Sequence, residues 1–259
     1  MVGLLSLPFE APNEDSRVIL SIIVPVYNEL QSLPQVLDNL LALPRPEGLG
    51  LQVIVINDGS TDGSGQFLRD FPLLPQLKVV HLDQNQGKGA AVRVGLVRAE
   101  GDIVAIQDAD LEYSPHHLLE LIEPIRSGQV EVVYGSRFLG RAQGMVWTQK
   151  LANQILCLWT NLLYGCHLTD PYTGYKIFSG RVARLLSESL VSRGFELEAE
   201  ITARLLGEGL MPLELPILYT ARSRMEGKKI RPRDGLLGLL RLLQMRLQRS
   251  SLRPENSAR

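Results

Sequence analysis

The stretch DIVAIQDAD, residues 102–110, decides how the first half of the chain folds. Its apolar centre predicts a buried strand over residues 102–108, and Asp108 and Asp110 stand where that strand ends. In open α/β sheets the carboxyl ends of the strands form the ligand-binding edge. Acids two residues apart on a strand point the same way, so both carboxylates can reach one cation. Such hard oxygen ligands suit Mg²⁺ or Mn²⁺, with phosphate oxygens completing the coordination.

A D-x-D pair by itself is typical of a solvated turn, so the interpretation depends on the flanking sequence. That sequence alternates apolar runs with helical patterns. We expect five strands, over residues 18–26, 51–57, 77–83, 102–108 and 130–135. Helices are expected over residues 30–43, 63–70, 87–99 and 114–127. Near-continuous Val and Ile runs between helices indicate parallel strands covered on both faces, and hence a doubly wound, mostly parallel α/β sheet.

The second half of the sequence is predominantly helical. Amphipathic helices are predicted over residues 147–163, 196–207 and 235–248. No run of about 18 uninterrupted apolar residues occurs, so no helix is expected to span a bilayer. Residues 1–12 lack the basic and apolar regions of a signal peptide. The two cysteines, Cys157 and Cys166, suggest neither a disulfide framework nor a zinc site, which favours a reducing cytoplasm.

Charge is distributed unevenly along the chain. The net charge of -1 and the 45% hydrophobic content indicate a globular protein without general affinity for polyanions, so nucleic acid is not expected as a partner. Residues 222–249, in contrast, contain nine basic and two acidic residues. A basic segment on an acidic body predicts a local anionic partner.

Three further polar turns follow expected strands. The first contains Tyr27, which can stack on a base, and Glu29, which can hydrogen-bond one. The second contains Asp58, and the third contains Lys88 between glycines that let backbone approach a ligand. Each turn alone is equally typical of a helix cap. Together with the acid pair they fit a nucleotide with a diphosphate and a divalent cation.

The motifs that carry a family resemblance occur in a fixed order. They are PVYNE (25–29), NDGSTDGS (57–64), NQGKGAA (85–91), DADLEYSP (108–115) and YGSRF (134–138). In this order the chain resembles a family 2 glycosyltransferase with the GT-A fold. TDPYTGYKIF (169–178), GFELEAEITARLL (194–206) and RSRMEGKKIRPRDG (222–235) are similar to the branch of dolichol-phosphate mannose synthases and bacterial polyprenyl-phosphate glycosyltransferases.

The resemblance implies roles for individual residues. The nucleotide would be held by Pro25, Tyr27, Glu29, Asp58, Lys88, Asp108 and Arg222. The metal ligands would be Asp110, Glu112 and Asp108, and the catalytic groups would be Asp108, Asp110, Arg137, Lys228 and Lys229. Two positions depart from the family pattern: Asn57 stands where many relatives have Asp, and Glu112 where relatives often carry a metal-binding Gln.

The activity that the resemblance implies is inverting, metal-dependent transfer of a single hexose, mannose or glucose. The donor would be a nucleotide sugar of the GDP-mannose or UDP-glucose type, and the acceptor a polyprenyl or dolichyl phosphate at the cytoplasmic face of a membrane. A phosphate acceptor is already anionic near pH 7 and needs little help from a base. Two alternatives stay open: transfer to a glycolipid or protein hydroxyl, with Asp170, Glu196 or Glu200 as base, and a nucleotide-sugar-binding scaffold.

The expected domain organisation follows. Residues 1–17 form an N-terminal extension, 18–221 a GT-A catalytic domain, 222–249 a basic loop with an amphipathic helix, and 250–259 a flexible tail. Residues 225–234 are interpreted as a lid over the phosphates. The last helix carries an apolar stripe of Leu236, Leu239, Leu240, Leu243 and Leu247. The stripe would contact a membrane surface peripherally, pack on the sheet, or meet a small membrane subunit or a second copy of the chain.

Overall fold

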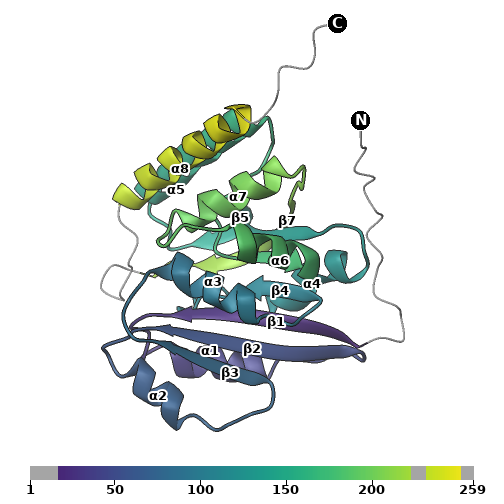
Figure 1. Ribbon diagram of the computed structural model, residues 1–259, viewed down its shortest axis with the longest axis vertical. Coiled ribbons are helices and arrows are strands. Elements are labelled where there is room, and N and C mark those ends of the chain that lie inside the picture. The colour runs from purple at the N-terminus through teal and green to yellow at the C-terminus, as the bar shows by residue number, and fades with distance from the viewer. Residues whose placement is uncertain (1–16, 223–231, 252–259) are drawn as a thin grey trace, which may run out of the picture.

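A single mixed sheet organises the chain. The structure, a computed structural model, describes residues 17–222 and 232–251 (Figure 1). The strands are β1 (Val18–Val26), β2 (Leu49–Asp58), β3 (Leu77–Leu82), β4 (Ile103–Ile106), β5 (Val132–Gln143), β6 (Lys176–Ser179) and β7 (Leu213–Thr220). The helices are α1 (Leu33–Leu41), α2 (Ser64–Asp70), α3 (Lys88–Arg98), α4 (His117–Arg126), α5 (Trp147–Tyr164), α6 (Gly180–Ser189), α7 (Leu197–Gly207) and α8 (Pro232–Ser251).

The strand order is β3-β2-β1-β4-β6-β5-β7. Strands β3, β2, β1 and β4 are parallel, and only β6 runs antiparallel to its neighbours. The predicted mostly parallel α/β sheet is therefore confirmed. Since β1, β2 and β4 are parallel, the turns that follow them lie at the same edge of the sheet. The chain order reverses on either side of β1, and open α/β sheets bind ligands at such a reversal.

Apolar side chains alternate between the two faces of the sheet. On one face, β1 residues such as Ile22 and Val24 pack under α1 and α4. On the other, Ile23 and Val104 pack under α3, α6 and α7. Burial on both faces explains why these strands are continuously apolar in sequence.

Two expectations from the sequence were incomplete. Strand β6 and helix α6 were not predicted, because a four-residue strand that begins with a lysine has too little apolar alternation to be recognised. The acid pair was placed on a strand, but β4 ends at Ile106, so Asp108 and Asp110 lie in the following turn. Buried Ala109 separates them, and both acids stay partly exposed.

Helices α5 and α8 form a third layer and lie side by side at the end of the molecule nearest β5 and β7 (Figure 1). The inner side of α8 packs on α7 and α5: Leu242 is fully buried among Ala199, Ala203 and Tyr164. Within residues 17–222 and 232–251, no helix is long and apolar enough to cross a membrane.

The glycines at the start of α3 serve packing within the chain. Gly87 has a left-handed φ of 96°, and a Cβ there would lie 2.3 Å from the Arg193 carbonyl oxygen. A Cβ on Gly89 would lie 2.4 Å from the Ser192 carbonyl oxygen, and the Gly89 amide donates to the Arg193 carbonyl at 2.7 Å. The sequence suggested that these glycines make room for a ligand. In the structure they let α3 approach the segment before α7.

We predict that Gly89→Ala destabilises the fold by about 1–3 kcal/mol, because the added methyl group meets backbone that cannot turn away. Urea unfolding monitored by circular dichroism measures the change. Gly235→Ala is the control: a Cβ there meets only Leu156 at 3.7 Å, so this helical position should be unaffected or slightly stabilised. Equal stability of the Gly89→Ala and wild-type proteins would contradict the packing role.

Candidate functional site

The acid pair lies in the turn after β4, at the carboxyl edge of the parallel strands. Asp108 forms an ion pair with Lys88, whose Nζ is 2.8 Å from the carboxylate. Burial raises the pKa of Asp110 to about 7, and the nearby charges of Asp108 and Glu112 contribute to the rise. The four acids Glu29, Asp108, Asp110 and Glu112 outnumber the two cations paired with them, Lys88 and Arg222, and this surplus of negative charge favours binding of a cation.

Arg222 lies among the acids of this edge. Its guanidinium pairs with Glu29 at 2.8 Å and with Asp110 at 2.9 Å. Its backbone amide donates to Glu112 at 2.8 Å, and the Tyr219 hydroxyl donates to the other oxygen of the same carboxylate at 2.8 Å. The fold thus brings together four residues that the sequence assigned separately to nucleotide and metal.

The donor set of this edge fits a divalent cation that protein and phosphate bind jointly. The guanidinium of Arg222 lies between Glu29 and Asp110, which shows that a positive charge is accommodated at this place. Among the residues that the structure describes, no group of three His, Cys, Asp or Glu side chains could hold a metal ion without help. Mg²⁺ is commonly bound through one or two carboxylates plus substrate phosphates, and Mn²⁺ accepts the same oxygen ligands.

The turns expected to hold the base are tied to one another. Pro25 lies in β1 beside Ile56 of β2, and Tyr27 follows the strand, partly buried. The Asn28 side chain accepts a hydrogen bond from the Thr61 amide at 2.7 Å, and Asn28 takes a positive φ of 52°. These contacts bring the turns after β1 and β2 together.

Asp58 is almost completely buried. Its two carboxylate oxygens accept hydrogen bonds from the Gln86 and Gly87 amides, each at 2.8 Å. Burial raises the pKa of this carboxyl group, against the effect of the two amides. Asp58 therefore orients the turn before α3, and any contact with a base would have to share an oxygen with that turn.

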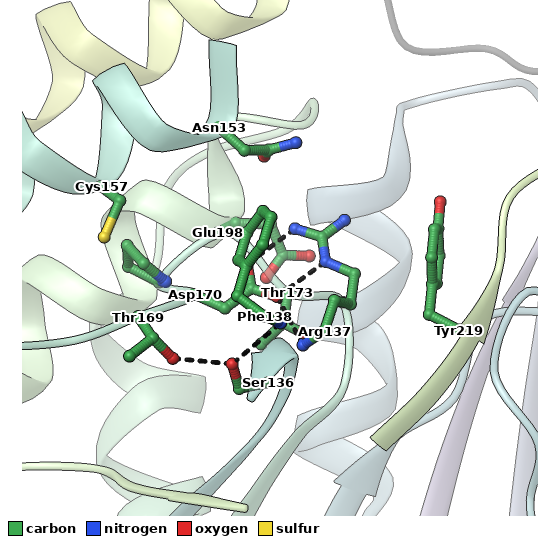
Figure 2. Close-up of polar contacts among 12 residues, drawn as sticks. Ser136, Arg137, Phe138, Asn153, Cys157, Thr169, Asp170, Thr173, Glu198 and Tyr219 are labelled. Carbon is green, nitrogen blue, oxygen red and sulfur yellow. Dashed lines mark hydrogen bonds and ion pairs between the residues drawn. The ribbon is translucent and has the colours of Figure 1, made fainter. Parts of the chain in front are cut away.

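Arg137 is buried at the end of the crevice near α5 (Figure 2). Its Nε and Nη2 atoms donate to the two Asp170 carboxylate oxygens, each at 2.7 Å, and its amide donates to the same group at 3.0 Å. The guanidinium also lies 5.3 Å from the centre of the Tyr219 ring. Such a bidentate pair fixes the orientation of the guanidinium.

A hollow of about 380 Å³ opens beside Arg137. It is lined by Arg137, Phe138, Gly140, Ala142, Met145, Lys150 and Gln154. Two cations and several apolar groups thus share one cavity between β5 and α5. This combination suits a ligand with an anionic head and an apolar chain.

The three acids considered as bases for a hydroxyl acceptor have other partners. Asp170 is held by Arg137. Glu196 accepts hydrogen bonds from the Arg193 and Gly194 amides. Glu200 is bound by the Ser192 amide and by two arginines. Each of the three carboxylates is thus already engaged by other groups of the chain. Lys228 and Lys229 lie outside the described residues.

Sequence reasoning missed Glu198 and Lys176. Glu198 lies between Lys88 and Lys176, with ion-pair distances of 3.1 and 2.8 Å. Burial alone would raise the pKa of Glu198, but Lys176 and Lys88 bring it below its ordinary value, so the group is ionised. The sequence contains three glutamates at alternate positions here, and only the tertiary structure shows which one faces the crevice.

Comparisons with known proteins show which family the chain resembles. The sequence profile described as "Glycosyl transferase family 2" matches residues 21–182. The polyprenol monophosphomannose synthase of Mycolicibacterium smegmatis is 27% identical over 223 residues, which cover 81% of this chain and 82% of the relative. The undecaprenyl-phosphate mannosyltransferase of Micrococcus luteus is 29% identical, covering 80% of this chain and 85% of the relative.

Among solved structures, glucosyl-3-phosphoglycerate synthase from Mycobacterium tuberculosis superimposes with a TM-score of 0.65 at 23% identity. The match covers 92% of this chain and 82% of that one, and it shows a shared fold. Another crystal structure of that enzyme contains Mn²⁺ and UDP. The family match spans more than half of the chain. The chain therefore belongs to glycosyltransferase family 2.

Proposed function

We propose that this enzyme transfers one hexose from a nucleotide sugar to a polyprenyl phosphate, with inversion at the anomeric carbon and with Mg²⁺ or Mn²⁺ as cofactor. One observation carries the proposal: the acids around Asp110 and the cation-lined hollow at Arg137 lie at the same edge of the sheet. The relatives named above as polyprenol and undecaprenyl-phosphate mannosyltransferases support the same acceptor class.

The donor would bind at the turns after β1, β2 and β4. Tyr27 and Glu29 would meet the base, and Asp108 the ribose and diphosphate, while Asp110 and Glu112 would hold the metal. The metal would supply electrostatic stabilisation to the departing diphosphate. Arg222 now neutralises Glu29 and Asp110. It would turn toward phosphate when a cation takes over that task.

The acceptor phosphate would bind at Arg137 and Lys150, with the start of its isoprenoid chain in the apolar part of the hollow. The second pKa of a phosphate monoester is about 6, so the acceptor is already a nucleophile near pH 7. In the reaction an acceptor oxygen forms a bond to the anomeric carbon, and the bond from that carbon to the diphosphate breaks. The electron pair leaves with the nucleoside diphosphate.

Inversion is favoured because the acids near the hollow are already engaged. Asp170 is bound to Arg137, and Glu198 is bound to two lysines. Neither carboxylate is placed to attack the sugar and form a covalent intermediate. A direct displacement by the acceptor phosphate needs no such group.

The α5–α8 pair is the proposed contact with the membrane, on its cytoplasmic side. Each helix has one stripe of exposed apolar side chains: Trp147, Leu151, Ile155, Leu158 and Leu162 on α5, and Leu236, Leu240, Leu243 and Leu247 on α8. The sequence of α5 contains no acidic residue, and that of α8 contains Asp234 alone against four arginines. An apolar stripe with basic neighbours is the pattern of an interfacial helix on anionic lipid.

The proposal also divides the chain into a catalytic domain and a C-terminal segment. We assign residues 18–221 to the catalytic domain and 222–249 to a basic loop and membrane-surface helix. Lys228 and Lys229 would meet the phosphates from that loop, which lies outside the described residues.

The activity is tested by a radiolabelled-donor screen. Purified protein with Mn²⁺ is offered UDP-glucose, GDP-mannose and related donors, each with undecaprenyl phosphate, and label extractable into organic solvent is counted. We expect one donor to label the lipid. Label on a glycolipid or protein hydroxyl instead would replace the acceptor. No transfer and no metal-dependent donor hydrolysis would indicate a binding scaffold.

Asp110→Asn should lower transfer by about 10²–10³-fold while the thermal unfolding curve stays close to that of the wild type. The substitution removes the charge of a proposed metal ligand and keeps its size. Loss of Mn²⁺ binding in the presence of nucleoside diphosphate, measured by electron paramagnetic resonance, is the second readout. Glu112→Gln should have a smaller effect, because the amide keeps an oxygen ligand. Near-normal turnover of Asp110→Asn would refute the metal assignment.

The membrane contact predicts that Leu158→Glu/Leu162→Glu releases the protein from phosphatidylglycerol vesicles in a co-sedimentation assay. Both side chains are more than half exposed, so the fold should tolerate the change. Val97→Glu is the matched control, because Val97 is 69% exposed on α3, outside the helix pair. Nucleotide binding should be unchanged in both variants. If the double variant still sediments like the control, α5 does not contact the bilayer.

A further inference from the structure

Four charged side chains form a line from the turn after β4 into the second half of the domain; Lys88 and Asp108 are half-buried, and Glu198 and Lys176 are buried. Lys88 stands 2.8 Å from Asp108 and 3.1 Å from Glu198, and Lys176 stands 2.8 Å from the other oxygen of Glu198. Two acids and two bases alternate, so the line is neutral as a whole. Buried charges persist where each has a partner of opposite sign.

Glu198 holds the middle of this line. Its side chain is 8% exposed, and each carboxylate oxygen faces a different ammonium group. Lys176 has no exposed surface and lies 4.5 Å above the Tyr134 ring. Without Glu198, Lys176 would be a buried cation without a carboxylate partner. Lys88 would be held from one side only.

The far end of the line reaches the acceptor side of the site. Lys176 donates to the carbonyls of Pro171 and Thr173, in the turn that begins with Asp170. Asp170 in turn fixes Arg137. Gly174, which follows Thr173 in this turn, packs close to the donor side: a Cβ at Gly174 would lie 2.5 Å from an Asp108 carboxylate oxygen. Glu198 is therefore connected to Asp108 through Lys88 and to Arg137 through Lys176 and this turn; Figure 2 draws Glu198 and Thr173 with Arg137 and Asp170.

We propose that Glu198 is a positioning residue that aligns the donor side of the site, Lys88 and Asp108, with the acceptor side, the 170–174 turn and Arg137. The inference rests on the proposed function, since it assumes that Asp108 meets the donor. Glu198 touches neither substrate. It acts through the two lysines.

The competing explanation is that Glu198 only stabilises the fold. Glu200 provides a matched comparison, because it lies on the same helix and is fully buried. Its carboxylate is bound by the Ser192 amide, Arg204 and Arg241, and it forms no contact with Lys88 or Lys176. Glu200→Gln therefore measures the effect of losing a buried carboxylate that binds neither lysine; it can reach Lys88 only indirectly, through the 192–193 segment.

The test compares Glu198→Gln with Glu200→Gln, which keep side-chain size and remove one charge each. UDP and GDP are titrated calorimetrically with Mn²⁺, and kcat and KM are measured with the donor found in the screen. We expect Glu198→Gln to weaken nucleotide binding about tenfold and to lower kcat about tenfold. These losses should appear even if both variants lose the same amount of thermal stability. Glu200→Gln should change affinity and kcat much less than Glu198→Gln does.

A double-mutant cycle with Lys88→Met identifies the route. If Glu198 acts through Lys88, Glu198→Gln should weaken nucleotide binding much less when Lys88 is already replaced. Where Glu198→Gln does not fold, Lys176→Met/Glu198→Leu replaces both members of the deeper pair by apolar groups. This variant should regain stability and still bind nucleotide weakly.

The outcomes separate this inference from the proposed function. A wild-type protein that binds neither UDP nor GDP with Mn²⁺ would overturn the nucleotide-sugar assignment itself. A wild type that binds and transfers, together with a Glu198→Gln variant that matches Glu200→Gln in affinity and kcat, would overturn the positioning role alone. Full additivity in the cycle with Lys88→Met would exclude the route through Lys88.

Discussion

Compensation of buried charge is the constraint on which the site depends. The carboxyl edge of the sheet gathers Glu29, Asp108, Asp110 and Glu112, and acids so close together are stable only with cations among them. Lys88 and Arg222 supply these cations. In the adjoining half of the site, Asp170 and Glu198 compensate Arg137 and Lys176. Most charges of the site are thus paired, and a phosphate or a divalent cation that enters would displace or share a partner.

The same charges join parts of the fold that are far apart in sequence. Arg222, just after β7, reaches the turn after β1, and Glu198 on α7 reaches Lys88 at the start of α3. The glycines at that start bring α3 against the segment before α7. The charges are largely paired, but part of the apolar surface is not covered. Leu242 of α8 is buried on α7, while the stripes on α5 and α8 remain exposed. The fold therefore ends in a layer with free apolar area beside the hollow at Arg137.

Much of this arrangement could be predicted from the sequence. Continuous Val and Ile runs predicted the parallel strands, because burial on both faces requires apolar residues at every position. Polar turns after those strands predicted one crevice edge, because parallel strands end on the same side. The motifs from Pro25 to Arg137 predicted the glycosyltransferase family, which the comparison with known families shows. Strand β6 was missed, since four residues led by a lysine carry little pattern.

The sequence by itself determined the parallel strands and the residue types in the turns that follow them. Only the tertiary structure decided which acid pairs with which base. Asp58, expected at a base, accepts hydrogen bonds from two backbone amides. Asp170 was a candidate base and holds Arg137. Glu198 was not singled out, yet it bridges two buried lysines. Ion pairs between distant segments follow from how helices pack on the sheet, and local residue patterns carry no information about that packing.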